Sequence, residues 1–96
     1  MNHELALPTL PSPALLEARA ALAAQQAALA AALVRLERAR ALVPAGQPGA
    51  QWHGAAQSVY RSSVRELAQR LDEAIDSVRA AKRSTGQAMA TMAARA

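Results

Sequence analysis

The sequence predicts an all-α fold, an antiparallel helical hairpin, and three observations lead to it. The chain has 96 residues of which 52% are hydrophobic, yet alanine supplies much of that share and only one Trp and one Tyr occur. Alanine has the highest helix propensity but little apolar area. Two long segments lack proline, and residues 44–49 between them hold two prolines and two glycines. Long helices joined by a short turn lie antiparallel.

The N-terminal segment, residues 1–12, is expected to form an extended lead-in. Pro8 and Pro11 each fix one backbone angle and disfavour helix in the residue before them. Ser12 is a favoured helix-capping residue, and Pro13 suits the first helical position because its missing N–H needs no partner there. A helix is therefore expected to begin at Pro13.

The first helix is predicted over residues 13–43, where nothing after the first position breaks a helix, and Pro44 ends it. Its large apolar residues follow a seven-residue step: Leu15, Leu22, Leu29, Leu36 and Val43. Small or polar residues stand three positions after each of the first four. A leucine stripe beside a stripe of small residues predicts close, left-handed packing against a neighbouring helix.

The second helix is predicted over residues 55–96, after a turn at residues 44–54. Gly86 weakens it, so fraying is expected beyond about residue 84. Large residues three or four positions apart predict the face that packs in the bundle: Tyr60, Val64, Leu67, Leu71, Ile75 and Val78. Spacing also predicts two local ion pairs, Glu66–Arg70 and Asp76–Arg79.

The apolar surface of each helix is wider than one neighbour can cover. Leu16, Leu33 and Val34 lie outside the leucine stripe of the first helix. A chain of this length also has difficulty burying enough surface by itself. The simple solution is a four-helix bundle made from two hairpins, in which the partner is a second copy or a similar small hairpin protein. The sequence leaves the choice between homodimer and heterodimer open.

The turn carries a W-x-G triplet formed by Trp52, His53 and Gly54, and Tyr60 follows eight residues after the tryptophan. In this layout the chain resembles the WXG family, small substrates of type VII (ESX) secretion systems. The resemblance covers nearly the whole chain in layout and rests on Trp52, Gly54 and Tyr60 in residue detail. It implies that Trp52 and Gly54 belong to an export motif completed by a partner's tail, and that a secretion ATPase is a partner.

The same residues also have structural roles. Gly54 suits a tight start to a helix because it adopts backbone angles that other residues avoid. Trp52 can lie over the bundle end while its N–H meets a loop carbonyl. One feature departs from the family: its exported members, or their partners, carry a Y-x-x-x-[D/E] tail, whereas Val64 follows Tyr60 by four and no acidic residue follows Ser84. Either a partner supplies that signal or this chain is not itself exported.

The composition argues against an enzyme, a cofactor and a metal site. Cysteine is absent, which excludes disulfides and thiolate chemistry. His3 and His53, the only histidines, have no metal-ligand spacing to other ligands. Acidic residues cluster on the second helix, but arginines flank them and predict a solvated face: Asp72, Glu73 and Asp76. The predicted role is protein–protein interaction.

Hydropathy bears on the expected localisation, and two alternative functions are considered with it. Residues 20–34 are too short to span a bilayer, and no leader is visible, so we expect secretion without a cleavable signal peptide after folding in the cytoplasm, or a cytoplasmic protein if it is not exported. A second hypothesis is a non-exported partner for the helical leader of a larger secreted toxin. A third, suggested by the net charge of +4, is a small nucleic-acid-binding protein. Interspersed acids and few aromatics disfavour nucleic-acid binding.

Overall fold

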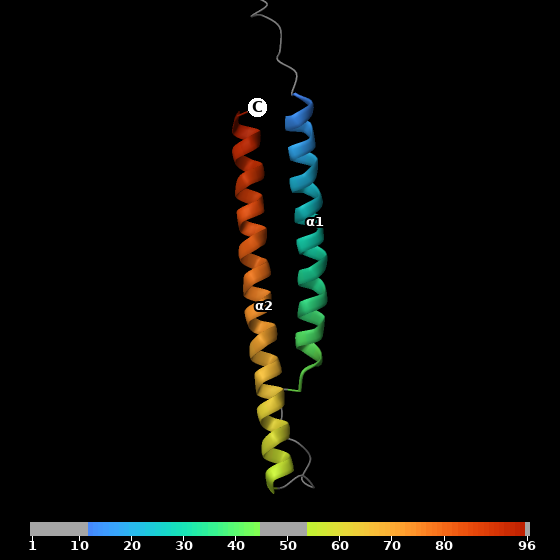
Figure 1. Cartoon of the computed structure of the whole chain (residues 1–96), viewed down its shortest axis with the longest axis vertical. Helices are drawn as coiled ribbons and strands as arrows, with labels where there is room; N and C mark the ends of the chain where they lie inside the picture. The colour runs from blue at the N-terminus through green and yellow to red at the C-terminus, as the bar shows by residue number, and fades with distance from the viewer. Residues whose placement is uncertain (1–11, 45–53, 96) are drawn as a thin grey trace, which may run out of the picture.

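The computed structural model describes residues 12–44 and 54–95, which form two antiparallel helices side by side (Figure 1). Helix α1 spans Pro13–Leu42 and helix α2 spans Gly54–Arg95. At ~1.5 Å per residue these helices are about 45 and 63 Å long. The end of α2 lies beside the start of α1. The predicted all-α helical hairpin is confirmed.

The start and the end of α1 are set by local hydrogen bonds. Ser12 is extended and its hydroxyl oxygen accepts a hydrogen bond of 3.0 Å from the backbone N–H of Leu15, with proline in the first turn. At the other end the backbone N–H of Val43 donates to the carbonyl of Arg40 at 3.1 Å. Pro44 cannot continue the helix. The capping role predicted for Ser12 is confirmed, and the helix ends one residue before the predicted Val43.

Helix α2 begins at Gly54 and runs without a break through Gly86 to Arg95. Gly54 has a φ of 76°, the left-handed region that favours glycine, as its place at the helix start predicts. A Cβ added at Gly86 would lie 3.7 Å from Nε2 of Gln26, so a side chain of α1 covers this glycine. Fraying of the tail beyond residue 84 stays a prediction.

Three polar contacts between the helices fix their antiparallel register. Gln25 contacts Thr85, Glu37 contacts Arg79, and Arg40 contacts Asp72. The partner on α2 moves toward the N-terminus as the residue on α1 moves toward the C-terminus, as an antiparallel pair requires.

The two local ion pairs predicted on α2 have different outcomes. Glu66 and Arg70 form one at 3.4 Å, which confirms the first prediction. The pairing of Arg79 with Asp76 is wrong, because the guanidinium of Arg79 instead reaches Glu37 of α1 at 2.9 Å. A long arginine side chain next to a second helix can choose a carboxylate there, which spacing along one helix does not reveal.

Helix α2 extends well past the end of α1 (Figure 1). The first part of α2 therefore has no α1 residue opposite it. Leu67, a predicted bundle residue, is 50% exposed and Val59 is 65% exposed. An apolar face that continues beyond the neighbouring helix leaves area for another chain to cover.

The core between the helices is thin. Within the described residues only Ile75 and Thr85 are buried, at 7% and 3% exposure. The other predicted core positions, apart from Leu67, are partly buried: Leu15, Leu22, Leu29, Leu36, Val43, Tyr60, Val64, Leu71 and Val78. Neither described helix has a stretch apolar and long enough to cross a membrane.

Candidate functional site

The candidate functional site is a surface of the hairpin, and its main feature is exposed apolar side chains on α1. Leu16 is 51% exposed and Leu42 is 83% exposed, and no residue of α1 is buried. The apolar residues of α1 are distributed around the whole helix, whereas those of α2 concentrate on one face. A helix that is apolar on all sides normally has neighbours on more than one side.

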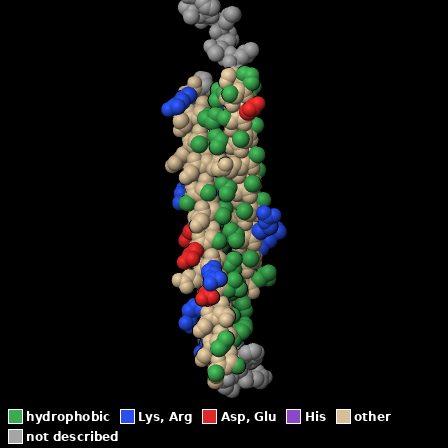
Figure 2. All heavy atoms as spheres, viewed as in Figure 1, with side chains coloured by type: hydrophobic (Ala, Val, Ile, Leu, Met, Phe, Trp, Pro, Cys, Tyr) green, Lys and Arg blue, Asp and Glu red, His purple; other side chains and the backbone are tan. Residues whose placement is uncertain are grey.

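The outer face of α1 consists of exposed residues on the side away from α2. Its members are Leu16, Glu17, Ala20, Ala21, Ala24, Ala27, Ala28, Ala31, Val34, Arg35 and Arg38. No charged residue occurs from Ala20 to Val34. In Figure 2 hydrophobic side chains run along α1 and along the junction of the helices, whereas acidic and basic side chains alternate on the lower part of α2. The two sides of the hairpin therefore differ in character.

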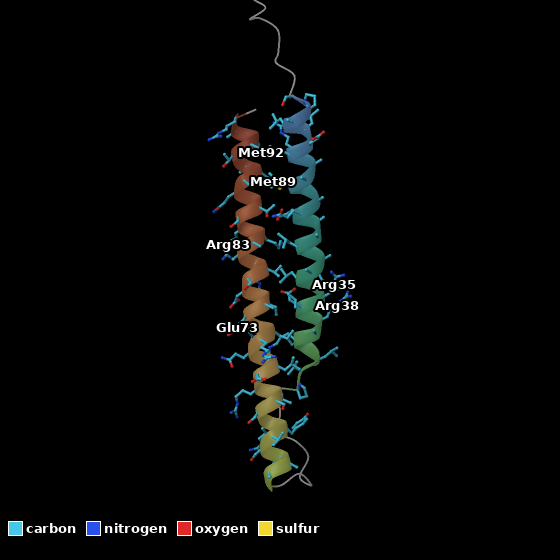
Figure 3. The ribbon with its side chains drawn as sticks, in the orientation of Figure 1. Arg35, Arg38, Glu73, Arg83, Met89 and Met92 are labelled. Atoms are coloured by element: carbon cyan, nitrogen blue, oxygen red, sulfur yellow. The ribbon has the colours of Figure 1, made fainter. Side chains whose placement is uncertain are left out.

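Charged residues mark both ends of this outer face. Arg35 and Arg38 project away from α2 at one end (Figure 3), and Glu17 is exposed near the other. The outer side of α2 is charged in its middle, where Glu73 and Arg83 point away from α1. Solvated charges of both signs suit a face that stays in water. The long uncharged surface of α1 suits contact with protein.

A polar layer interrupts the apolar contact between the helices. The side-chain amide of Gln25 donates a hydrogen bond of 2.8 Å to the hydroxyl oxygen of buried Thr85. Next to it, Oε1 of Gln26 is buried and accepts no hydrogen bond from the described residues. Buried polar groups favour one register over others because a shifted register leaves them unpaired. The sequence pattern shows a polar residue at this step of α1 but does not reveal its partner.

Residues in the described part of the chain line at least two shallow grooves along the hairpin. The first is lined by the two ion pairs between the helices, Arg40–Asp72 at 2.8 Å and Arg79–Glu37 at 2.9 Å, over Ile75. These charges are paired and partly exposed, an arrangement that stabilises the helix pair modestly.

The second groove is apolar and lies toward the open end of the hairpin. Leu22 of α1 and Met89 and Met92 of α2 line it, with Arg19 at its edge. Figure 3 shows both methionines on the side of α2 that faces α1. Methionine adapts its shape to different neighbours, so this end of the hairpin can accommodate packing by another apolar side chain.

The predicted chemical residues do not form a reactive cluster in the described part of the chain. Asp72, Glu73 and Asp76 are all exposed, as predicted for a solvated face, and Asp72 pairs with Arg40. Residues 12–44 and 54–95 contain no group of three or more His, Cys, Asp or Glu arranged to hold a metal ion.

The predicted turn motif is only partly described. Trp52, His53 and His3 lie outside the described residues, while Gly54 forms the start of α2. Tyr60 is partly buried two turns further along. A comparison of the chain with family models, curated proteins and solved structures finds no match.

Proposed function

We propose that this protein is a non-enzymatic helical hairpin that acts by pairing with another helical hairpin in an assembly of four helices. The observation that carries the proposal is the thin core: of the described hydrophobic side chains only Ile75 is buried, while large ones remain exposed on both helices. Full burial of one large apolar side chain contributes ~1.5–3 kcal/mol. A partner that covers exposed apolar side chains such as Leu16 and Val34 would therefore stabilise the hairpin.

We further propose that pairing serves type VII secretion, in which the protein is an exported effector or a co-exported carrier. The support is the resemblance to the WXG family, in which a W-x-G turn joins two long helices. The positive φ of Gly54 at the start of α2 is consistent with a glycine required at that place in the motif. The proposal includes a secretion ATPase as a partner and export of the folded pair.

A second candidate function is a dedicated partner for the helical leader of a larger secreted toxin. The lack of any acidic residue after Ser84 favours it, because the family's tail signal ends in Asp or Glu. Co-purification with one much larger helical protein, and retention of this chain in the cell, would support this candidate. Appearance of the chain alone in the culture medium would contradict it.

Secretion is tested in cells that carry a type VII ATPase. The chain and a Gly54→Ala variant are expressed with and without that ATPase, and both proteins are measured in cells and medium. The proposal predicts release of the native chain that depends on the ATPase. Equal release without the ATPase, or release that tracks a marker of cell lysis, would contradict it. Circular dichroism of the G54A variant shows whether a loss of export arises from unfolding.

A further inference from the structure

We infer that the partner of this hairpin is a second copy of the same chain, and that the two copies meet through the outer faces of α1 in an antiparallel, self-complementary arrangement. This inference rests on the proposed pairing function and names the partner and the surface. It is carried by the positions of the charges on the outer face and by the uncharged alanines between them.

Six exposed residues of the outer face follow each other at alternating steps of four and three. They are Glu17, Ala21, Ala24, Ala28, Ala31 and Arg35. This step keeps all six on one side of a helix and is the spacing of a helix–helix contact. The four members between the charged ends are alanines, which let two helix axes approach to about 8 Å, the short end of the usual range.

The positions are symmetric about residue 26. Glu17 lies nine residues before it and Arg35 nine after; Ala21 and Ala31 are each five away, and Ala24 and Ala28 two away. In an antiparallel pair of α1 helices related by a two-fold axis near residue 26, Glu17 therefore stands opposite Arg35 of the second copy. Symmetry repeats the same ion pair at the other end. Alanines face alanines over the whole length between them.

The alternative orientation is disfavoured by the same charges. A parallel pair of α1 helices in register would place Glu17 beside Glu17 of the second copy, and Arg35 beside Arg35. Like charges placed together across an interface oppose binding and so select orientation. The antiparallel arrangement also pairs opposite ends of the helix dipoles. Arg38, one turn beyond Arg35 on the same outer face, adds a second positive charge near Glu17 of the other copy.

The exposed apolar side chains of α1 and the thin core of the hairpin both support this contact surface. Val34, at 44% exposure, and Leu16 border the contact and are too exposed for a finished core. By contrast, the outer side of α2 carries charges such as Glu73 and Arg83, and its uncharged stretch from Ser84 to Ala94 is shorter than the one from Ala20 to Val34 on α1. The outer face of α1 is thus the surface where a second copy finds both apolar contact and opposite charge.

A charge-exchange experiment tests the inference. Glu17→Arg places two arginines opposite each other at both ends of the contact, and Arg35→Glu places two glutamates there. Each variant alone should dimerise about tenfold more weakly than the native chain, because two surface ion pairs become repulsive. An equimolar mixture of the two variants should recover a tight dimer, since opposite charges then face each other again at both ends. The dissociation constants are measured by analytical ultracentrifugation.

The matched control variants make the same two types of charge exchange at positions outside the proposed contact. Glu73→Arg and Arg83→Glu lie on the outer side of α2, away from the proposed contact, and should leave the dimer unchanged both separately and mixed. A native chain that dimerises but responds equally to both sets of variants, or a mixture that shows no recovery, would overturn the inference.

Cysteine cross-linking gives a readout that does not depend on affinity. The chain has no natural cysteine, so Ala24→Cys/Ala28→Cys introduces the only thiols. The antiparallel contact brings the thiol at position 24 of one copy to the thiol at position 28 of the other, and mild oxidation should give a covalent dimer. Ala80→Cys/Ser84→Cys has the same spacing on exposed positions of α2 and should remain monomeric on denaturing gels. Equal cross-linking of both would overturn the inference.

Failure of the inference and failure of the proposed function give different results. A native chain that is monomeric and poorly helical until a different hairpin protein is added would overturn the inference and leave the pairing function in place. A dimer that ignores the α1 substitutions would do the same. A native chain that is fully helical and monomeric at all concentrations would overturn both.

Discussion

The side-chain amide of Gln25 donates a hydrogen bond of 2.8 Å to the hydroxyl of Thr85, a residue sixty positions later and the most buried polar residue described. This contact joins the middle of α1 to the last third of α2. Because the hydroxyl is buried, a register shifted by one turn would leave it without this partner. The contact therefore favours a single alignment of two alanine-rich helices that could otherwise slide.

Removal of the Thr85 hydroxyl should weaken the hairpin. Thr85→Val keeps the shape but deletes the acceptor, and loss of one such hydrogen bond costs ~1 kcal/mol. Thr91→Val, at an exposed position on α2, is the control and should change stability little. Urea unfolding followed by circular dichroism measures the difference. Equal stability of the two variants would show that the contact contributes nothing.

The two described glycines should respond in opposite directions to alanine. Gly54→Ala places a Cβ at a φ of 76°, which costs ~1–2 kcal/mol although nothing lies within 4 Å. Gly86→Ala adds a Cβ at an ordinary contact of 3.7 Å inside a helix, and should stabilise by ~0.4–1 kcal/mol. Thermal melts of both variants check this. A destabilised G86A would mean that Gln26 cannot yield at that contact.

Ile75 should be the most sensitive hydrophobic position of the described chain. It is 7% exposed, and Ile75→Ala should reduce the free energy of unfolding by ~2–5 kcal/mol, the usual range for a buried isoleucine. Val59→Ala is the control, because Val59 is 65% exposed in a single hairpin and its truncation should change the free energy of unfolding little. Denaturant titration at a fixed protein concentration compares them. A large loss for Val59→Ala would reveal that another chain covers this position.

The ion pair between Arg40 and Asp72 should contribute little. The two side chains are 35% and 58% exposed, and exposed pairs are worth at most ~1 kcal/mol. A double-mutant cycle with Arg40→Gln and Asp72→Asn should give a coupling energy of a few tenths of a kcal/mol that falls as salt is added. A coupling that is large and insensitive to salt would contradict this view of the pair.

The fold follows from features that act over a few residues, and the sequence therefore predicts it well. Ser12, Pro13 and Pro44 mark the ends of α1, and the spacing of leucines marks its inner side. Contacts between the helices depend on register, which the sequence leaves undetermined. The partner predicted for Arg79 is wrong for this reason, and the spacing of residues does not predict the bond from Gln25 to Thr85 at all.

For the candidate interaction surface, too, the sequence predicts only a part of what the structure shows. Alanine-rich composition and exposed leucines predict that a partner is needed, but not which side of α1 it covers. Only the direction of α2 from α1 shows that Ala24 and Ala28 face outward with Glu17 and Arg35 at the two ends. The turn around Trp52 lies outside the described residues, so its predicted place over the bundle end stays a prediction.

A single hairpin is, on our proposal, an incomplete fold, and the solution mass of the purified chain tests this most directly. Light scattering and circular dichroism are recorded together over a range of concentrations. We predict a helical species of twice the 10.0 kDa chain mass, with a melting temperature that rises with protein concentration. A fully helical species of single chain mass, with a melting temperature independent of concentration, would contradict the pairing proposal.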